Sequence, residues 1–192
     1  MLQWDEKAVR VIAGKYGSRR IASAHGMAVR PTSDRLRETL FDILQSRVAG
    51  CFFVDGYAGT GAVGIEAASR GARRVAFLEK HRPTVALIRK NLETLGITEG
   101  VEVLPGDVCR GLATLAESGE LADILFFDPP YEEKAEYARV MELLAESVLV
   151  GPRTQVIFER TRKLNLPEEY GRLHRARTVM QGDAALDFFA PR

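Results

Sequence analysis

The decapeptide DGYAGTGAVG, residues 55–64, follows a short apolar run and opens a segment rich in alanine. Gly59, Gly61 and Gly64 satisfy the pattern G-x-G-x-x-G, in which missing side chains permit a tight turn, close approach of a ligand to the backbone and close packing of a helix on a strand. The pattern is weak by itself, but its place between a predicted strand and a predicted helix strengthens it. We therefore expect a ligand-binding loop here, with a purely structural strand–helix turn as the alternative.

Strand-like and helix-like segments alternate around this loop. Apolar residues recur at helical spacing over 34–48, where Ser33 or Asp34 can cap the start of a helix. After it, the expected strands are 51–55, 74–78, 101–104, 124–127 and 155–159, and the expected helices are 62–70, 84–95, 111–117 and 136–148. This alternation predicts an α/β fold with a doubly wound, mostly parallel sheet.

Both ends of the chain depart from the alternation. Two extended runs, 173–179 and 184–190, flank a Gly-Asp pair and predict a C-terminal antiparallel hairpin. The stretch 9–21 is also extended and predicts a small basic β-appendage. We therefore expect a basic N-terminal extension with this appendage at 1–30 and one main domain at 31–192.

Composition limits the class of protein. The 192 residues, 46% hydrophobic and 28% charged, are typical of a soluble globular chain. No apolar run approaches the roughly 18 residues of a membrane span, and the start lacks a signal-peptide core, so we expect a cytoplasmic protein with no membrane contact. Neither Cys51 and Cys109 nor the scattered histidines have the spacing of metal ligands, so no metal is expected.

The net charge of +1 conceals a segregation of charge. Bases outnumber acids in 8–37 and again in 160–177, whereas acids outnumber bases in 51–159. This pattern favours a catalytic domain with polyanion-binding flanks. Ordinary solvated surface charge explains the same counts equally well.

Acidic residues stand at the ends of three predicted strands. Because parallel strands end at one edge of a sheet, Asp55, Glu79 and Asp107 should lie near one another. Glu79 suits a ribose diol, and Asp107 suits an adenine amino group, although a solvated strand end and a turn explain them as well. Asp55 would repel a pyrophosphate but attract the ammonium and sulfonium groups of S-adenosylmethionine.

The tetrapeptide Asp128-Pro129-Pro130-Tyr131 ends a further apolar strand. The Asp128 carboxylate and a backbone carbonyl such as that of Pro129 can hold the two N–H groups of an exocyclic amine. Prolines stiffen that carbonyl because their φ is fixed, and Tyr131 offers a face for a flipped-out base. The alternative is a strand-ending turn, in which Asp and Pro are common.

These motifs together resemble a known family. The loop from Asp55, then Glu79, Asp107 and above all Asp128 to Tyr131 resemble the successive motifs of class I S-adenosylmethionine-dependent methyltransferases that act on exocyclic amines. The stretches RVIAGK (10–15) and RPTSDRLRETLF (30–41) and the terminal Gly-Asp resemble the bacterial RsmD family, over nearly the whole chain from Val9 onward. The resemblance implies a Rossmann-like, seven-stranded sheet and methylation of the N2 amine of a guanine in 16S ribosomal RNA.

The resemblance and the charge pattern together imply a set of site residues. S-adenosyl-L-methionine is the expected cofactor, held by Asp55, Ala58, Gly59, Gly61, Glu79, Asp107 and Val108. The amine would be held by Asp128, Pro129, Pro130 and Tyr131. The rRNA phosphates would contact Arg10, Lys15, Arg19, Arg20, Arg30, Arg35 and Arg37. The expected partner of this presumptive monomer is 16S rRNA within small ribosomal subunit particles.

Three other functions stay open. Amine chemistry does not separate guanine N2 from adenine N6, so an adenine-N6 DNA methyltransferase is an alternative. The glycine pattern also fits a nicotinamide-dependent oxidoreductase, which Asp55 opposes, and a nucleic-acid-binding protein with an inactive fold is a third possibility. Within the resemblance, Gly56-Tyr57 replaces bulkier apolar residues and predicts a looser loop, and the eight residues before Val9 extend past the usual family start.

Overall fold

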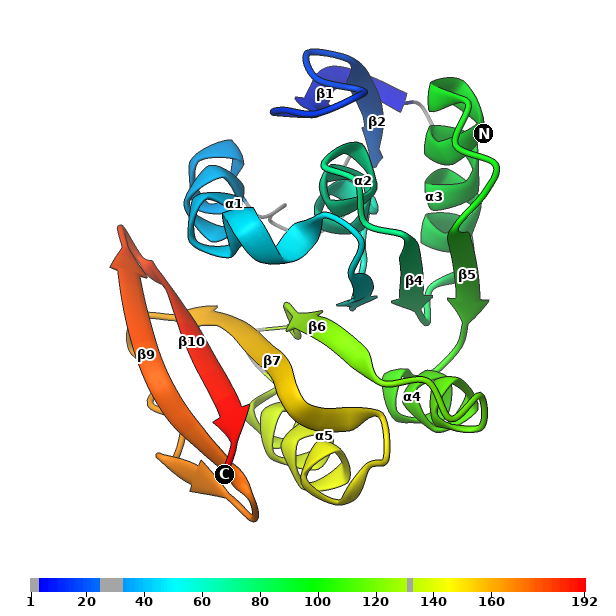
Figure 1. Cartoon of the computed structure of the whole chain (residues 1–192). Coiled ribbons are helices and arrows are strands. Elements are labelled where there is room, and N and C mark those ends of the chain that lie inside the picture. The colour runs from blue at the N-terminus through cyan, green and yellow to red at the C-terminus, as the bar shows by residue number, and fades with distance from the viewer. Residues whose placement is uncertain (1–3, 25–32, 131–132) are drawn as a thin grey trace.

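The computed structural model describes residues 4–24, 33–130 and 133–192, with side chains for all of these except 4–8 and 24. Strands and helices alternate along most of this length (Figure 1). In chain order the elements are β1 (Trp4–Arg10), β2 (Arg20–Ala24), α1 (Asp34–Val48), β3 (Phe52–Gly56), α2 (Ala62–Ser69), β4 (Arg74–Glu79), α3 (Arg82–Leu95), β5 (Val101–Pro105), α4 (Val108–Ala116), β6 (Ala122–Phe127), α5 (Lys134–Glu146), β7 (Val150–Thr161), β8 (Glu169–Tyr170), β9 (Leu173–Gln181) and β10 (Ala184–Pro191).

Within the described residues the main sheet has eight strands, in the order β5-β4-β3-β6-β7-β10-β9-β8. The five strands from β5 to β7 are parallel, and β10, β9 and β8 each run antiparallel to the preceding neighbour. The expected mostly parallel sheet with a C-terminal antiparallel hairpin is confirmed. The eighth strand, absent from the expected seven, is the two-residue β8, which pairs with β9.

The central strands are buried on both faces. Phe53 and Phe77 belong to a hydrophobic cluster with α1, α2 and α3, whereas Phe52 and Leu78 belong to a second cluster with α4 and α5. Figure 1 shows these two helical layers on opposite sides of the sheet. Strands covered on both faces form continuous apolar runs, which is why their positions were readable from the sequence.

Three helices begin earlier than their apolar spacing indicates, among them α5, which begins at Lys134. α3 begins at Arg82, after His81 as the N-cap residue, because the proline that follows is compatible with the first helical turn. α4 begins at Val108 because the Asp107 carboxylate accepts hydrogen bonds from the backbone N–H groups of Cys109 and Arg110. Among the described helices, none combines the length and apolar character of a membrane span.

β1 and β2 form a separate two-stranded antiparallel sheet, with Val9 opposite Ile21. We call this hairpin the appendage. Val9, Ile21 and the intervening Tyr16 are buried and share the hydrophobic cluster of α1 to α3. The appendage is therefore docked on the helical layer, as Figure 1 also shows. The expected division between residues 30 and 31 lies outside the described residues.

A buried carboxylate on α2 fixes this docking. Glu66 has no exposed surface, and its two oxygens accept hydrogen bonds from the N–H groups of Ile12, at 2.7 Å, and Ala13, at 3.0 Å. The Glu66 side chain also accepts a hydrogen bond from Arg70 Nε at 2.7 Å. A buried charge with these partners has its desolvation cost offset, so the appendage is held in one orientation.

Candidate active site

The acidic residues expected at strand ends do lie along one edge of the sheet. In the strand register, Gly56 of β3 lies opposite Leu78 of β4 and Phe127 of β6. The residues that flank these positions, Asp55, Glu79 and Asp128, therefore meet at the ends of three neighbouring parallel strands. We call this the carboxyl edge. The strand order reverses between β3 and β6, and such reversals are where open α/β sheets bind ligands.

The glycine loop follows β3 directly onto α2. Gly61, the N-cap residue of α2, has φ = 78°, a left-handed conformation that favours glycine. At Gly64, a Cβ atom would lie 2.3 Å from the Phe77 ring, so α2 packs directly against β4. The Ala58 N–H donates to the Leu78 carbonyl at 3.0 Å and the Gly61 N–H to the Ala58 carbonyl at 2.7 Å. Gly61 therefore lies in a turn held against β4, whereas Gly64 lies in the first turn of α2, where it packs against β4.

Glu79 faces this loop from the end of β4. One of its oxygens accepts a hydrogen bond from Gly59 N–H at 3.0 Å, and the other accepts from His81 N–H at 2.8 Å. Each carboxylate oxygen can accept roughly two hydrogen bonds, so both keep capacity for a further donor. The Glu79 carboxylate is thus held in one orientation and partly exposed, and it can still accept hydrogen bonds from a diol.

Asp55 is nearly buried beneath the loop, with 2% of its surface exposed. Its Oδ2 accepts a hydrogen bond from Gly64 N–H at 2.8 Å. The pKa of Asp55 is raised to about 8, chiefly because the group is buried; the Gly64 hydrogen bond opposes this rise and the nearby charge of Glu79 adds to it. A cation placed beside this carboxyl group would favour its ionised form.

Asp107 stands where β5 leads into α4, and its carboxylate is already engaged. Oδ1 caps α4 and accepts from Arg139 Nη1 at 3.1 Å, and Oδ2 accepts from Arg139 Nη2 at 2.7 Å. The hydrogen bonds from Arg139 hold the pKa of Asp107 below its usual value. Oδ2 keeps capacity for one more donor. Val108, which follows, is buried as the first residue of α4, where backbone N–H groups lack intrahelical partners.

A polar chain at this edge was not predicted from the sequence. The Tyr57 hydroxyl donates to Glu136 Oε2 at 2.7 Å, and Arg139 pairs with both Glu136, at 2.8 Å, and Asp107, at 2.7 Å. Tyr57 itself has φ = 61°, unusual for a residue other than glycine. The expectation that Gly56-Tyr57 loosens the loop is therefore wrong, because the tyrosine ties the loop to α5 and, through Arg139, to the start of α4.

The segment after β6 begins as expected, beside the end of β3. Asp128 is half-buried, and its N–H donates to the Gly56 carbonyl at 3.4 Å. Burial, and to a lesser extent the charge of Asp128, raises the pKa of the buried Tyr137 of α5. Pro129 is buried and Pro130 exposed. The remaining member of the tetrapeptide, Tyr131, lies outside the described residues.

The basic residues expected to contact RNA differ in exposure. Those that are exposed are Arg10, Lys15, Arg19, Arg20 and Arg35. Arg19 also donates to the carbonyls of Thr94 and Leu95, at 2.7 and 3.0 Å, and so caps the end of α3. Arg30 lies outside the described residues.

Arg37 corrects the sequence-based prediction. Its side chain is fully buried and donates to the Arg10 carbonyl at 2.6 Å and to Asp34 Oδ1 at 3.0 Å. A guanidinium enclosed in this way has no surface to offer a phosphate. Arg37 instead joins α1 to the appendage.

Asn91, which the sequence did not single out, connects the appendage to the glycine loop. This residue of α3 is 1% exposed. Its amide accepts from Ala22 N–H at 2.9 Å and donates to the Ala22 carbonyl at 3.0 Å and the Thr60 carbonyl at 3.0 Å. One buried side chain thus holds both strand β2 and the loop that precedes α2.

Comparison with known proteins places this geometry in context. Residues 9–190 match the family described as Conserved hypothetical protein 95. The ribosomal RNA small subunit methyltransferase D of Escherichia coli is 34% identical over 153 residues, which cover 77% of this chain and 75% of that protein.

Solved structures share the fold. A hypothetical protein of Thermus thermophilus is 30% identical, with a TM-score of 0.78 over 94% of this chain and 98% of that one. An RNA methyltransferase of Salinibacter ruber, solved in complex with S-adenosyl-L-homocysteine, is 21% identical, with a TM-score of 0.66 over 84% of this chain and 94% of that one. At this identity the second match concerns the fold alone.

Proposed function

The chain belongs to the family described as Conserved hypothetical protein 95, and from that premise we propose that it transfers a methyl group from S-adenosyl-L-methionine to the N2 amine of a guanine in 16S ribosomal RNA. The observation that carries the proposal is the meeting of the buried Asp55 and the half-buried Asp128 at the ends of the adjacent strands β3 and β6. One carboxyl group suits a cationic cofactor and the other suits an amine.

The cofactor half of the site fits S-adenosylmethionine, which supplies an electrophilic methyl group on a positively charged sulfur. Asp55, buried under the loop, would face the positive charge, and Glu79 would accept from the ribose hydroxyls. Asp107 Oδ2 and the N–H of Val108 would meet the adenine, while Ala58, Gly59 and Gly61 form the wall of the loop. Asp55, once ionised, disfavours the pyrophosphate of a nicotinamide cofactor beside that loop, whereas Glu79 would accept from the ribose of either cofactor.

The amine half of the site would act by orientation and charge. An exocyclic amine of a base is a poor nucleophile because its lone pair is delocalised into the ring. Asp128 and the carbonyl of Pro129 would accept its two N–H groups and turn the lone pair toward the methyl group. As the new N–C bond forms and the bond from sulfur to the methyl carbon breaks, positive charge would pass to the nitrogen, where the Asp128 carboxylate would stabilise it until the nitrogen releases a proton. The fixed φ of the buried Pro129 and the hydrogen bond from Asp128 N–H to the Gly56 carbonyl restrain the backbone that carries both proposed acceptors.

The test of this proposal is transfer of labelled methyl from S-adenosylmethionine to unmethylated small ribosomal subunits, naked 16S rRNA and duplex DNA, followed by nucleoside analysis. We expect the label in N2-methylguanosine, and the two RNA samples will show whether an assembled particle is required. Label in DNA adenine would favour the adenine-N6 alternative. Calorimetry with S-adenosylhomocysteine and NAD in parallel separates the methyltransferase from the oxidoreductase.

The exposed bases of the appendage provide a second test. Replacing Arg10, Lys15 and Arg20 together with alanine should weaken rRNA binding and make it less sensitive to salt. The slope of log affinity against log salt should fall by roughly 0.7 to 0.9 for each phosphate contact that is lost. Arg19 is left intact because it caps α3. Arg153→Ala, which removes an exposed arginine near the start of β7 at the opposite edge, is the control. An unchanged slope in the triple variant would exclude the appendage from the RNA interface.

A further inference from the structure

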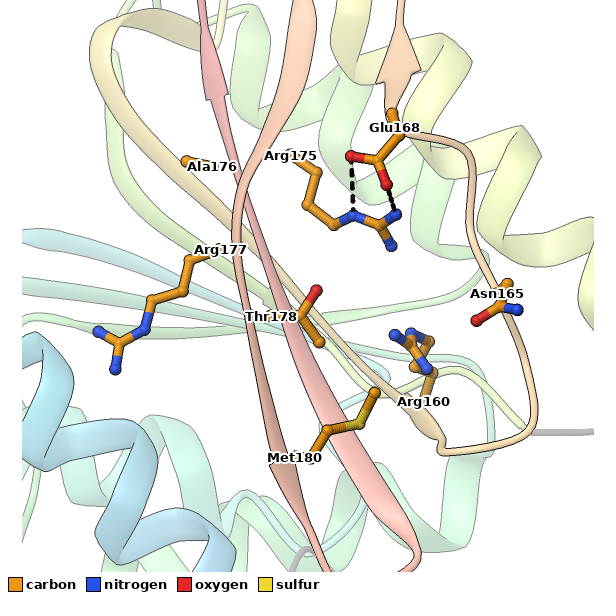
Figure 2. Close-up of a pocket in the computed structure, with 8 residues that line it drawn as sticks. All are labelled: Arg160, Asn165, Glu168, Arg175, Ala176, Arg177, Thr178 and Met180. Atoms are coloured by element: carbon orange, nitrogen blue, oxygen red, sulfur yellow. Dashed lines mark hydrogen bonds and ion pairs between the residues drawn. The ribbon is translucent and has the colours of Figure 1, made fainter.

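A hollow of about 410 Å³ lies away from the glycine loop, between the end of β7, the segment that follows it and β9. Its lining residues are Arg160, Asn165, Glu168, Arg175, Ala176, Arg177, Thr178 and Met180 (Figure 2). We call it the β9 hollow. Thr178 and Met180 lie on the same side of β9 as Arg160, whereas Arg177 points away to the other side. The hollow falls within the basic C-terminal segment of the sequence, for which the proposed reaction provides no role.

Apart from Glu168 at its rim, the floor of the β9 hollow carries one more positive than negative group. The buried Arg160 donates to the buried Asp187 through Nε at 2.5 Å and Nη2 at 3.2 Å. The same carboxylate accepts from Thr178 Oγ1 at 2.6 Å and from Arg175 Nη1 at 3.3 Å. One carboxylate therefore faces two guanidinium groups. Such a cluster favours a further anion, and Arg guanidinium suits phosphate oxygens.

The exposed carboxylate of Glu168 pairs with one of these guanidinium groups and neutralises its charge. Glu168, whose side chain is 75% exposed, pairs with Arg175 at the rim of the hollow, as Figure 2 shows. Arg175 is only 13% exposed, but Glu168 lies in solvent, where water and salt screen its charge. Glu168 is therefore a partner that an incoming phosphate can displace.

The wall of the hollow suits a flat, partly polar ring. Met180 is 50% exposed, one of few large apolar side chains so exposed among the described residues. Its polarizable thioether packs well against the face of an aromatic ring. Asn165, also exposed, lies across the hollow and can both donate and accept at the edge of a base.

The β9 hollow adjoins the carboxyl edge. β7 lies beside β6 in the sheet, with Phe158 opposite Phe127, so Arg160 comes just past the level of Asp128. The turn between β9 and β10 is at the same end, because Ala184 pairs with Thr161. A polynucleotide whose base reaches Asp128 would thus extend next over the end of β7.

We propose that the β9 hollow binds a nucleotide that flanks the methylated guanine on a single-stranded stretch of RNA. The phosphate lies on Arg175 in place of Glu168, above the buried Arg160–Asp187 pair, and the base lies on Met180 with its edge toward Asn165. Bringing a base out of its stack separates it from its neighbours, and a second pocket for a neighbour offsets that loss. This inference rests on the proposed RNA methyltransferase function and adds a second contact surface to it.

The test compares variants whose expected effects have opposite signs. Met180→Ala combined with Asn165→Ala should weaken binding of unmethylated 16S rRNA by roughly tenfold, as expected when a base loses its stacking partner. Glu168→Gln should tighten that binding a few-fold because it frees Arg175 for phosphate. Both proteins should bind S-adenosylhomocysteine as the unmodified chain does. Val148→Ala, which truncates a side chain that is 66% exposed just before β7 at the opposite edge, is the control.

Structural damage cannot produce this pattern, because it would not make the Glu168 variant bind more tightly. Unchanged rRNA affinity in the Met180 and Asn165 double variant, or weaker binding by Glu168→Gln, would overturn the proposal. Failure of the proposed function is a different result. It would appear as an unmodified chain that transfers no methyl group to rRNA.

Discussion

Replacing Asp128 with alanine is expected to lower the rate of methyl transfer by about 10²- to 10³-fold or more while the affinity for S-adenosylhomocysteine stays within about twofold. The expected decrease in rate has this size because the variant loses one fixed partner for the charge that develops in the transition state. The separation of the two effects follows from the geometry. Asp128 follows β6, whereas the proposed cofactor contacts lie on β3, β4 and the start of α4.

The measurement is single-turnover transfer of labelled methyl to rRNA, with calorimetric titration of S-adenosylhomocysteine on the same preparations. Asp42→Ala, which removes an exposed carboxylate from α1, controls for the change in net charge. Asp128→Asn adds a finer comparison, because it keeps one acceptor oxygen and removes the negative charge. Full activity in Asp128→Ala would show that the amine is held elsewhere. A parallel loss of cofactor binding would show that Asp128 belongs to the cofactor half of the site.

The fold was predictable because β3, β4 and β6 are largely buried and each is followed by a helix with its own apolar stripe. The glycine loop was predictable for the same local reason. Gly61 needs its left-handed φ, and Gly64 needs its contact with Phe77, within a few residues of β3. The acids at the carboxyl edge follow from one topological rule, that parallel strands end together.

The burial of Arg37 could also have been predicted from the sequence. Arg37 stands at helical spacing from Phe41, Leu44 and Val48, all of which are buried on α1. A charged residue on an apolar stripe is a warning that it has a buried partner. The partner was not predictable, because the Arg10 carbonyl belongs to the appendage, and nothing local places that strand over α1.

Long-range polar pairs could not be predicted from the sequence patterns. Asp187 interrupts the apolar run AALDFF, which signals a buried pair, but its partner Arg160 comes from β7. The link between Tyr57 and Glu136 likewise depends on how α5 packs beneath the loop. Such pairs are determined by tertiary packing. They decide which charged side chains already have a partner, and composition alone does not reveal this.

Asp55→Asn is expected to stabilise the ligand-free protein while it weakens cofactor binding by at least about tenfold. The pKa of Asp55 is raised by burial from 3.8 to about 8, so between these pH values the folded chain holds a proton that the unfolded chain has released. Stability is therefore lost as pH rises from about 4 to about 8. Asparagine has no such proton, and its side-chain oxygen can still accept from Gly64 N–H. At pH 7 we expect a gain on the order of 4 kcal/mol in the free energy of unfolding.

Urea unfolding of both proteins at pH 5 and pH 8, without ligand, measures this effect, with Asp42→Asn as the exposed control. The stability advantage of Asp55→Asn should be larger at pH 8 than at pH 5. Only the unmodified chain loses stability as pH rises, because ionising its carboxyl group under the loop is unfavourable. An advantage that does not change with pH would mean that Asp55 is ionised in the folded protein. Calorimetry completes the argument. If asparagine stabilises the fold yet loses S-adenosylhomocysteine, the carboxyl group is kept at a cost to stability because a positively charged ligand requires it.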